Sequence, residues 1–187
     1  IADLSSFKQI EKAAEEYKSL NKPIDVLLNN AGIMNTERKI TEDGLEEVFA
    51  VNHLAYFLLT NLLIEKILES GLKRVVNVSS DAHRFLKSMN FDDLQSEEEF
   101  KMFSAYGQSK LANILFTKKL SSLYQEEGLT TNCLHPGFVS TSIGAQNENL
   151  AFFARLIRWV SPLIAKPSDK GAETVSYTHL TLPTILR

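Results

Sequence analysis

The sequence of 187 residues holds a single cysteine, Cys133, so no disulfide can form within one chain. A lone cysteine is typical of proteins that fold in a reducing compartment. No uninterrupted apolar run reaches the roughly 20 residues of a membrane-spanning helix, and no signal peptide opens the sequence. The first residue is Ile1 rather than Met, so any anchor would lie in a segment ahead of it. We therefore expect a cytoplasmic protein, or one held at the cytoplasmic face of an intracellular membrane through such a segment.

A basic surface stripe and a cluster of metal ligands are also missing. The sequence has 20 Lys and Arg against 23 Asp and Glu, a net charge of −3, and the positive residues are scattered. Nucleic-acid binders concentrate positive residues on one face, so we predict no nucleic-acid partner. We predict no metal site either, because the four histidines, at positions 53, 83, 135 and 179, lie far apart in the sequence. The G-x-S-x-G turn of serine hydrolases does not occur.

What the sequence does contain is an alternation of short apolar runs with longer amphipathic patterns, which is typical of an α/β fold. The length suits one domain. Ser5 or Ser6 precedes the first helical pattern and is expected to cap it, and Gly128 is expected to close a turn. We predict helices at about 7–20, 45–68 and 104–124, strands at 24–28, 74–78 and 131–134, and the end of another strand at 2–4.

Tyr106 and Lys110 lie four residues apart on one of these helices, so their side chains share a face. A free tyrosine titrates with a pKa of about 10 and is a poor proton shuttle at neutral pH. A nearby ammonium favours the phenolate and lowers that pKa toward the working range. Taken alone, however, Y-x-x-x-K is more simply explained as a surface Tyr–Lys pair.

Polar or glycine-containing sequences directly follow three of the predicted strands, at 29–32 (N-N-A-G), 79–80 (S-S) and 135–141 (H-P-G-F-V-S-T). Parallel sheets bind ligands beyond the carboxyl ends of their strands. A serine there can donate a hydrogen bond to a substrate oxygen as charge builds on it, and a glycine lets the backbone approach a ligand closely. Ordinary turns and caps would use the same residue types.

Asn52 falls on the apolar stripe of the predicted helix at 45–68, a face that should pack on the sheet. A buried amide that lacks hydrogen-bond partners costs roughly 1–3 kcal/mol. We therefore expect Asn52 to have a specific partner, and we favour a functional role over a structural accident.

In this order, the motifs N-N-A-G, V-N-H, V-S-S, Y-x-x-x-K and P-G resemble those of the short-chain dehydrogenase/reductase family. The resemblance covers residues 3 to about 177 and implies a Rossmann-like, doubly wound parallel α/β sheet. The sequences at 76–83 and 109–117 are similar to the retinol dehydrogenase-like branch, which acts on lipophilic retinoids, steroids or other carbonyls, usually with NADP(H). Residues 178–187 do not resemble the family, so we predict a partial domain at 1–177 and a tail of doubtful origin at 178–187.

The resemblance implies roles for individual residues. Tyr106 resembles the family's general acid/base, Ser80 the residue that polarises the substrate oxygen, and Lys110 the one that holds the nicotinamide ribose. Asn52 resembles the asparagine that supports this lysine through a water. The cofactor is expected to contact Asp3, Asn30, Ala31, Gly32, Tyr106, Lys110, Pro136, Gly137, Val139 and Thr141.

The family's glycine-rich T-G-x-x-x-G-x-G turn, which holds the pyrophosphate at a helix N-terminus, does not occur in the sequence. The strand that chooses between NAD and NADP is not found either. We therefore expect a fold truncated at both ends, with 24–28 as an exposed edge strand and little cofactor binding by this chain alone. Residues 152–164 are expected to form an apolar helix, either a lid over the substrate cleft or a core or membrane-surface helix.

We predict an oxidoreductase that transfers hydride between NAD(P)(H) and a small, lipophilic carbonyl or alcohol, with NADP favoured over NAD by the resemblance. The alternative is a catalytically silent nucleotide-binding or interaction protein on the same fold. A silent protein would not need all four of the family's site residues, and their joint presence argues against it: Asn52, Ser80, Tyr106 and Lys110. In the family, the helices that carry Asn52 and Tyr106 commonly form a dimer interface, so the resemblance also implies a homodimer.

Overall fold

The computed structural model describes residues 1–136 of the chain. Its sheet has three parallel strands in the order β1 (Val26–Asn29), β2 (Arg74–Val78) and β3 (Thr130–Leu134). The strands are short and mostly apolar, as buried parallel strands usually are. The α/β class with a parallel sheet is therefore confirmed, and each of these strands begins and ends within two residues of its predicted bounds.

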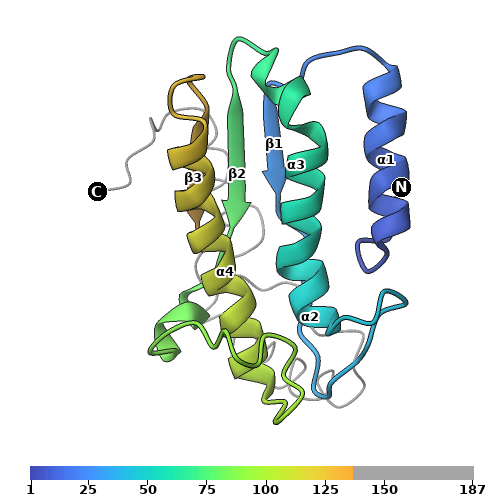
Figure 1. Ribbon diagram of the computed structural model, residues 1–187. Coiled ribbons are helices and arrows are strands. Elements are labelled where there is room, and N and C mark those ends of the chain that lie inside the picture. Colours follow the sequence, from blue (N-terminus) through green and yellow to red (C-terminus); the bar gives the residue numbers. More distant parts are fainter. Residues whose placement is uncertain (137–187) are drawn as a thin grey trace, which may run out of the picture.

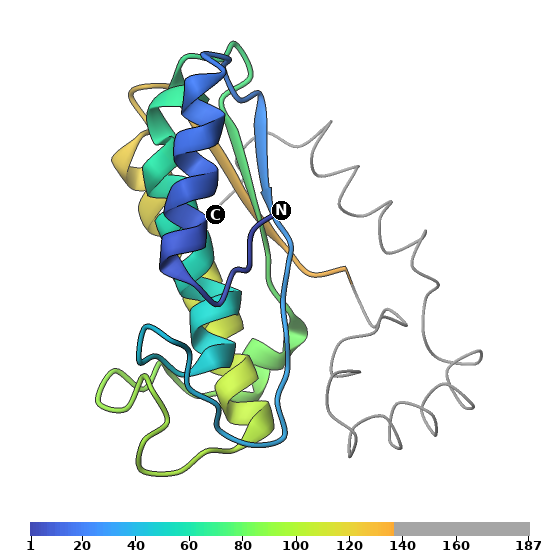
Figure 2. The same cartoon turned by 90° about the vertical axis from the view of Figure 1, so that its right-hand side faces the viewer.

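Three long helices, α1 (Phe7–Ser19), α3 (Ala55–Leu68) and α4 (Met102–Leu123), cover one face of this sheet (Figures 1 and 2). α1 packs on the side of α3 that faces away from α4 (Figure 1). Successive side chains of a strand point to opposite faces, so only alternate strand positions meet the helices. The core between the two layers is built from the buried residues Ala14, Ile24, Leu63, Ile67, Val75, Phe116, Leu120 and Leu129.

α3 continues a helical segment that begins earlier in the chain. The short α2 (Glu47–Phe49) leads into a π-helical stretch at Ala50–Leu54, which runs directly into α3. The segment is long and apolar enough to span a membrane, with a mean hydropathy of 1.4 over its 18-residue test window, but half of that window is buried inside the fold. We interpret it as the core helix that the apolar stripe predicts.

Carboxylates, rather than the predicted serine, satisfy the first backbone N–H groups of these helices. Ser6 occupies the N-cap position of α1, but its hydroxyl donates to Glu42 instead of accepting from the helix. The Asp43 carboxylate accepts from the N–H of Phe7 at 2.9 Å in its place. At α2, the carboxylate of Glu46 accepts from two backbone N–H groups at 2.7 and 2.8 Å. Ser6 is thus the N-cap residue, as predicted, but its side chain does not cap the helix, and Asp43 accepts from the first N–H instead.

Residues 2–4 form no strand, so that prediction is wrong. The Asp3 carboxylate accepts hydrogen bonds from the backbone N–H (2.9 Å) and the hydroxyl (2.8 Å) of Ser5. These bonds hold the pKa of Asp3 below its usual value. A strand needs a neighbouring strand to satisfy its backbone, and the described sheet places none beside this segment.

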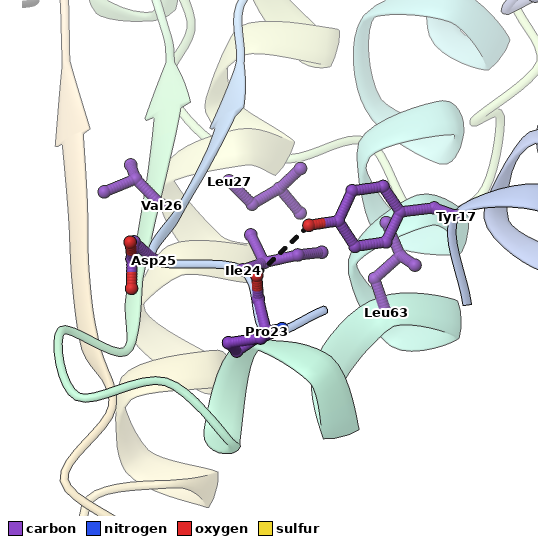
Figure 3. Close-up of a pocket in the computed structure, with 7 residues that line it drawn as sticks. All are labelled: Tyr17, Pro23, Ile24, Asp25, Val26, Leu27 and Leu63. Atoms are coloured by element: carbon purple, nitrogen blue, oxygen red, sulfur yellow. Dashed lines mark hydrogen bonds between the residues drawn. The ribbon is translucent and has the colours of Figure 1, made fainter. Parts of the chain in front are cut away.

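β1 forms an edge of the described sheet, as predicted, and Leu28 on it is 43% exposed. A cavity of about 520 Å³ lies at the start of this strand, and Figure 3 shows the hydroxyl of Tyr17 reaching the carbonyl of Pro23 there, at 3.1 Å. Ligands of parallel sheets bind at the opposite, carboxyl ends of the strands. The cavity is therefore separate from the site described below. Its lining consists of Tyr17, Pro23, Ile24, Asp25, Val26, Leu27 and Leu63.

Candidate active site

Ser80, Tyr106 and Lys110 meet beyond the carboxyl end of β2. Ser80 comes two residues after the end of β2, and the other two residues come from the first half of α4. The Ser80 side chain lies close enough to the Tyr106 hydroxyl to influence its pKa, and the Lys110 ammonium lies 5.6 Å from the centre of the Tyr106 ring. Tyr106 is 8% exposed and Lys110 is 2% exposed. The two residues are thus a buried pair, and the simpler explanation of a surface Tyr–Lys pair is wrong.

Burial controls the protonation of both residues. It raises the pKa of Tyr106 above its usual value, although the Ser80 side chain works in the other direction. It also lowers the pKa of Lys110 to about 8, against a smaller opposing effect of Cys133. The expectation that Lys110 lowers the Tyr106 pKa is therefore wrong for this structure. Here the ammonium donates to the backbone carbonyl of Val78 at 3.1 Å, and loss of water around the phenol is the largest influence on the pKa of Tyr106.

Ser80 has a structural role as well as a place in the site. Its hydroxyl oxygen accepts from the N–H of Ala82 at 3.2 Å and so caps a 3₁₀-helix at Asp81–Phe85. Accepting with a lone pair leaves the O–H of a serine able to donate elsewhere. α4 passes very close to this small helix, since a Cβ on Gly107 would lie 3.0 Å from the Ala82 carbonyl oxygen. The glycine at 107 thereby allows Tyr106 to reach Ser80.

Asn52 is fully buried in the π-helical stretch and clamps the loop that follows β1. Its Oδ1 accepts from the N–H of Ile33 at 2.7 Å, and its Nδ2 donates to the Ile33 carbonyl and to Ser109 Oγ, both at 3.0 Å. A Cβ on Gly32 would lie 3.3 Å from Asn52 Oδ1 and from Lys110 Nζ. Asn52 therefore has the specific partners that its place on an apolar stripe predicts. The same contacts bring it close to the lysine.

The other predicted cofactor residues lie at different distances from this centre. Asn30 and Ala31 are exposed just beyond β1, where the Ala31 carbonyl accepts from the hydroxyl of Tyr56 at 2.6 Å. Pro136 follows the carboxyl end of β3. Asp3, by contrast, lies at the start of the chain and accepts a hydrogen bond from neighbouring Ser5. Outside the described residues fall Gly137, Val139, Thr141, the predicted helix at 152–164 and the tail at 178–187.

The sequence prediction missed two polar residues on the face of α4 that carries Tyr106 and Lys110. Asn113 and Thr117 follow Tyr106 by seven and eleven residues, and both are fully buried. Residues at these spacings share one helix face with Lys110. The signal was present in the sequence, because two more polar residues on the helix face that carries Lys110 need partners for the same reason as Asn52.

Lys110 has hydrogen-bond donors to spare, and Gly32 beside it has no side chain, so a ligand with hydroxyl groups can bind there. An ammonium has three donors, and within residues 1–136 Lys110 Nζ makes one hydrogen bond, to the Val78 carbonyl. The absent side chain of Gly32 keeps the backbone of the loop close to Nζ, where a Cβ would crowd it. Two neighbouring hydroxyls, as on a ribose, suit the remaining donors. The residues present therefore fit the nicotinamide ribose of NAD(P)(H).

A parallel α/β sheet with a buried Ser–Tyr–Lys group beyond its strands defines a class of oxidoreductases that use a nicotinamide cofactor. Residues 1–150 match the family model described as short chain dehydrogenase. The chain belongs to the short-chain dehydrogenase family.

Individual relatives support this assignment. Retinol dehydrogenase 13 of Homo sapiens is 46% identical over 178 residues, which is 94% of this chain and 54% of that protein. A crystal structure of an uncharacterised protein from Mycobacterium paratuberculosis matches 97% of this chain and 58% of its own with 34% identity and a TM-score of 0.70. The NADPH-bound carbonyl reductase from chicken fatty liver shares the fold, with 21% identity, a TM-score of 0.67, and 98% of this chain and 69% of that one covered. The chain spans little more than half the length of the curated relatives it matches.

Proposed function

We propose that this protein interconverts a lipophilic carbonyl compound and its alcohol, with NADP(H) as the hydride carrier. The observation that carries the proposal is the buried contact of Tyr106 with Ser80, with the Lys110 ammonium beside the same ring. The retinol dehydrogenase named among the relatives supports a lipophilic substrate. The NADPH-bound carbonyl reductase of the same fold supports NADP(H) as the cofactor.

Each residue of the site has a distinct task in this reaction. The nicotinamide, when bound, exchanges hydride with the substrate carbon. Tyr106 donates its hydroxyl proton to the substrate oxygen during reduction and takes it back during oxidation. Ser80 donates a hydrogen bond to the same oxygen, so that charge on it is stabilised as it develops. Lys110 holds the ribose hydroxyls, and Asn52 fixes the loop at Ile33 that leads past Gly32 to the lysine.

The protonation of Tyr106 suits the reduction of a carbonyl. Burial raises the pKa of this phenol, so that at neutral pH the side chain carries the proton that reduction consumes. Ser80 is the group that opposes this shift, and it is also the group that would share the substrate oxygen.

The test is NADPH consumption by the whole translated product of the gene. Retinal and long-chain aldehydes are compared with propanal and with NADH in place of NADPH. We expect turnover with the lipophilic aldehydes, at a higher kcat/KM than with propanal, and its loss in Tyr106→Phe. If the protein binds NADPH but consumes none with any aldehyde in the panel, it is a silent nucleotide-binding protein and the proposal is wrong.

A further inference from the structure

Asn113 connects two backbone carbonyls that lie beside the proposed catalytic residues. Its Nδ2 donates to the carbonyl oxygen of Asn52 at 2.9 Å and to that of Val78 at 3.3 Å. The Val78 carbonyl is the one that also accepts from Lys110 Nζ. One fully buried amide group thus joins the π-helical stretch that carries Asn52 to the end of β2 that precedes Ser80.

The orientation of this amide is set by His53. Asn113 Oδ1 lies 3.0 Å from His53 Nδ1, and an amide oxygen can only accept, so Nδ1 must carry the proton. With the amide turned over, its oxygen would face the carbonyl oxygens of Asn52 and Val78, and both contacts would be repulsive. The NH₂ group therefore faces the carbonyls and the amide oxygen faces His53, which matches the Nδ1–H tautomer.

His53 itself is half-buried and packs between two aromatic rings. Its ring centre lies 5.2 Å from that of Phe49 and 6.1 Å from that of Phe116. Burial lowers the pKa of His53 below its usual value, although the hydrogen bond with Asn113 works against this. The imidazole is therefore neutral at pH 7, and the aromatic packing leaves its Nδ1 aimed at the amide.

We propose that Asn113, oriented by His53, is a positioning residue that fixes the backbone of Asn52 and thereby the loop and lysine that Asn52 adjoins. This inference rests on the proposed function for its catalytic consequence only. The structural part of the proposal is independent of that function: the hydrogen bonds between Asn52 and Ile33 weaken when the Asn113 amide loses its orientation. Asn113 touches no reacting atom in this scheme and acts through Asn52 and Val78.

Two substitutions of His53 separate a lost donor from a packing defect. His53→Phe removes the Nδ1 donor and keeps an aromatic ring between Phe49 and Phe116. His53→Asn places an amide N–H near the position of Nδ1, so it keeps the donor while giving up the ring. A positioning role predicts that His53→Phe is impaired and His53→Asn is close to native, whereas a packing role predicts the reverse order. Asn113→Leu serves as a third variant, since it removes the amide at similar size.

Amide hydrogen exchange at Ile33 measures the strength of the Asn52–Ile33 hydrogen bonds and does not depend on enzyme activity. The Ile33 N–H donates to Asn52 Oδ1 at 2.7 Å, whereas the Ile24 N–H donates to the Lys66 carbonyl at 2.8 Å, away from the site. In the ¹⁵N-labelled 187-residue chain we expect His53→Phe to speed exchange at Ile33 by about tenfold or more and to leave Ile24 unchanged. Nitrogen NMR of the native chain should show His53 as the Nδ1–H tautomer.

The kinetic counterpart uses the whole translated product with NADPH and a lipophilic aldehyde. His53→Phe should lower kcat by about tenfold, because small displacements of a catalytic group are costly, while the KM for the aldehyde stays within about threefold. An Nε2–H tautomer, or equal changes at Ile33 and Ile24, would overturn the positioning role. A native protein without turnover but with the expected exchange pattern would overturn the proposed function and leave Asn113 as the determinant of the Asn52–Ile33 hydrogen bonds.

Discussion

Asn29 and Asn77 stand opposite each other on neighbouring strands, and the Nδ2 of Asn29 donates to the Oδ1 of Asn77 at 2.8 Å beneath the site. Both side chains face the helices. Asn29 also donates to Thr60, and Asn77 donates to Thr117. The strands that carry the candidate site are therefore joined to α3 and α4 by a buried chain of hydrogen bonds as well as by apolar packing.

The first prediction concerns this buried chain. Asn77→Leu removes two hydrogen bonds and leaves the Asn29 amide and the Thr117 hydroxyl short of a partner, so we expect a loss of about 2–4 kcal/mol in unfolding free energy. Asn61→Leu is the matched control, because Asn61 is an exposed asparagine on α3 that bonds its own helix at Phe57. That variant should change the unfolding free energy by less than about 0.5 kcal/mol. Urea titration of both variants measures the difference, and similar losses would show that the network adds nothing.

The second prediction is a pH dependence of stability from Lys110. Its pKa is about 8 in the folded chain against 10.5 for an unperturbed lysine. Between these values the unfolded chain keeps the proton that the folded chain has released, so the free energy of unfolding rises with pH. Between pH 8 and 10.5 the free energy of unfolding of the native chain should rise by about 3 kcal/mol more than that of Lys110→Met, which lacks the titrating group.

Chemical unfolding of both proteins across this pH range measures that gain. Tyr106 and Cys133 titrate in both proteins, so most of their contribution cancels in the difference. A difference between the two proteins that is independent of pH would mean that Lys110 titrates at its usual value and is hydrated in the folded chain.

The third prediction addresses the proton donor. Tyr106→Phe removes one hydroxyl and keeps the ring, so the fold and NADPH binding should survive while kcat falls by at least about 100-fold. Lys110→Met should weaken NADPH binding as well as the rate, because the ammonium is assigned to the ribose. Tyr17→Phe is the control: its hydroxyl bonds Pro23 at the other end of the sheet, and its loss should leave kcat unchanged. Retention of most of the activity in Tyr106→Phe would mean that the proton comes from another group.

The fourth prediction uses the close approach at Gly32. An added Cβ would lie 3.3 Å from both Asn52 Oδ1 and Lys110 Nζ, so Gly32→Ala should displace the ammonium by a few tenths of an ångström. We expect NADPH affinity and kcat to fall by about tenfold, with a change in unfolding free energy below about 1 kcal/mol. Gly71→Ala, where an added Cβ meets nothing within 4 Å, is the matched control and should behave like the native protein. Equal behaviour of the two variants would remove Gly32 from the site.

The parts of this fold that the sequence predicts are those that depend on local spacing. The strand at 74–78 and the helix around Tyr106 are visible as an apolar run and a helical pattern, and the structure has both. The partners of Asn52 are also foreseen, because a polar residue in an apolar stripe has to be satisfied. These inferences need only near neighbours in the chain.

The parts that could not be predicted depend on residues far apart in the sequence. The hydroxyl of Ser6 is taken by Glu42, which lies 36 residues away, and no local pattern announces that contact. The sign of the Tyr106 pKa shift was missed for a related reason. A neighbouring charge can be seen in the sequence, but the degree of burial that outweighs it is set by how α4 packs on β2.

The π-helical stretch at Ala50–Leu54 makes the number of residues before α3 as important as their identity. A π turn holds one residue more than an α turn, so deleting one residue there would restore a regular helix and turn everything upstream by about 100° relative to α3. α3 could stay on the sheet, but the amide of residue 52 would swing away from the loop at Ile33. A single-codon deletion in this stretch would therefore leave a protein that folds but does not function.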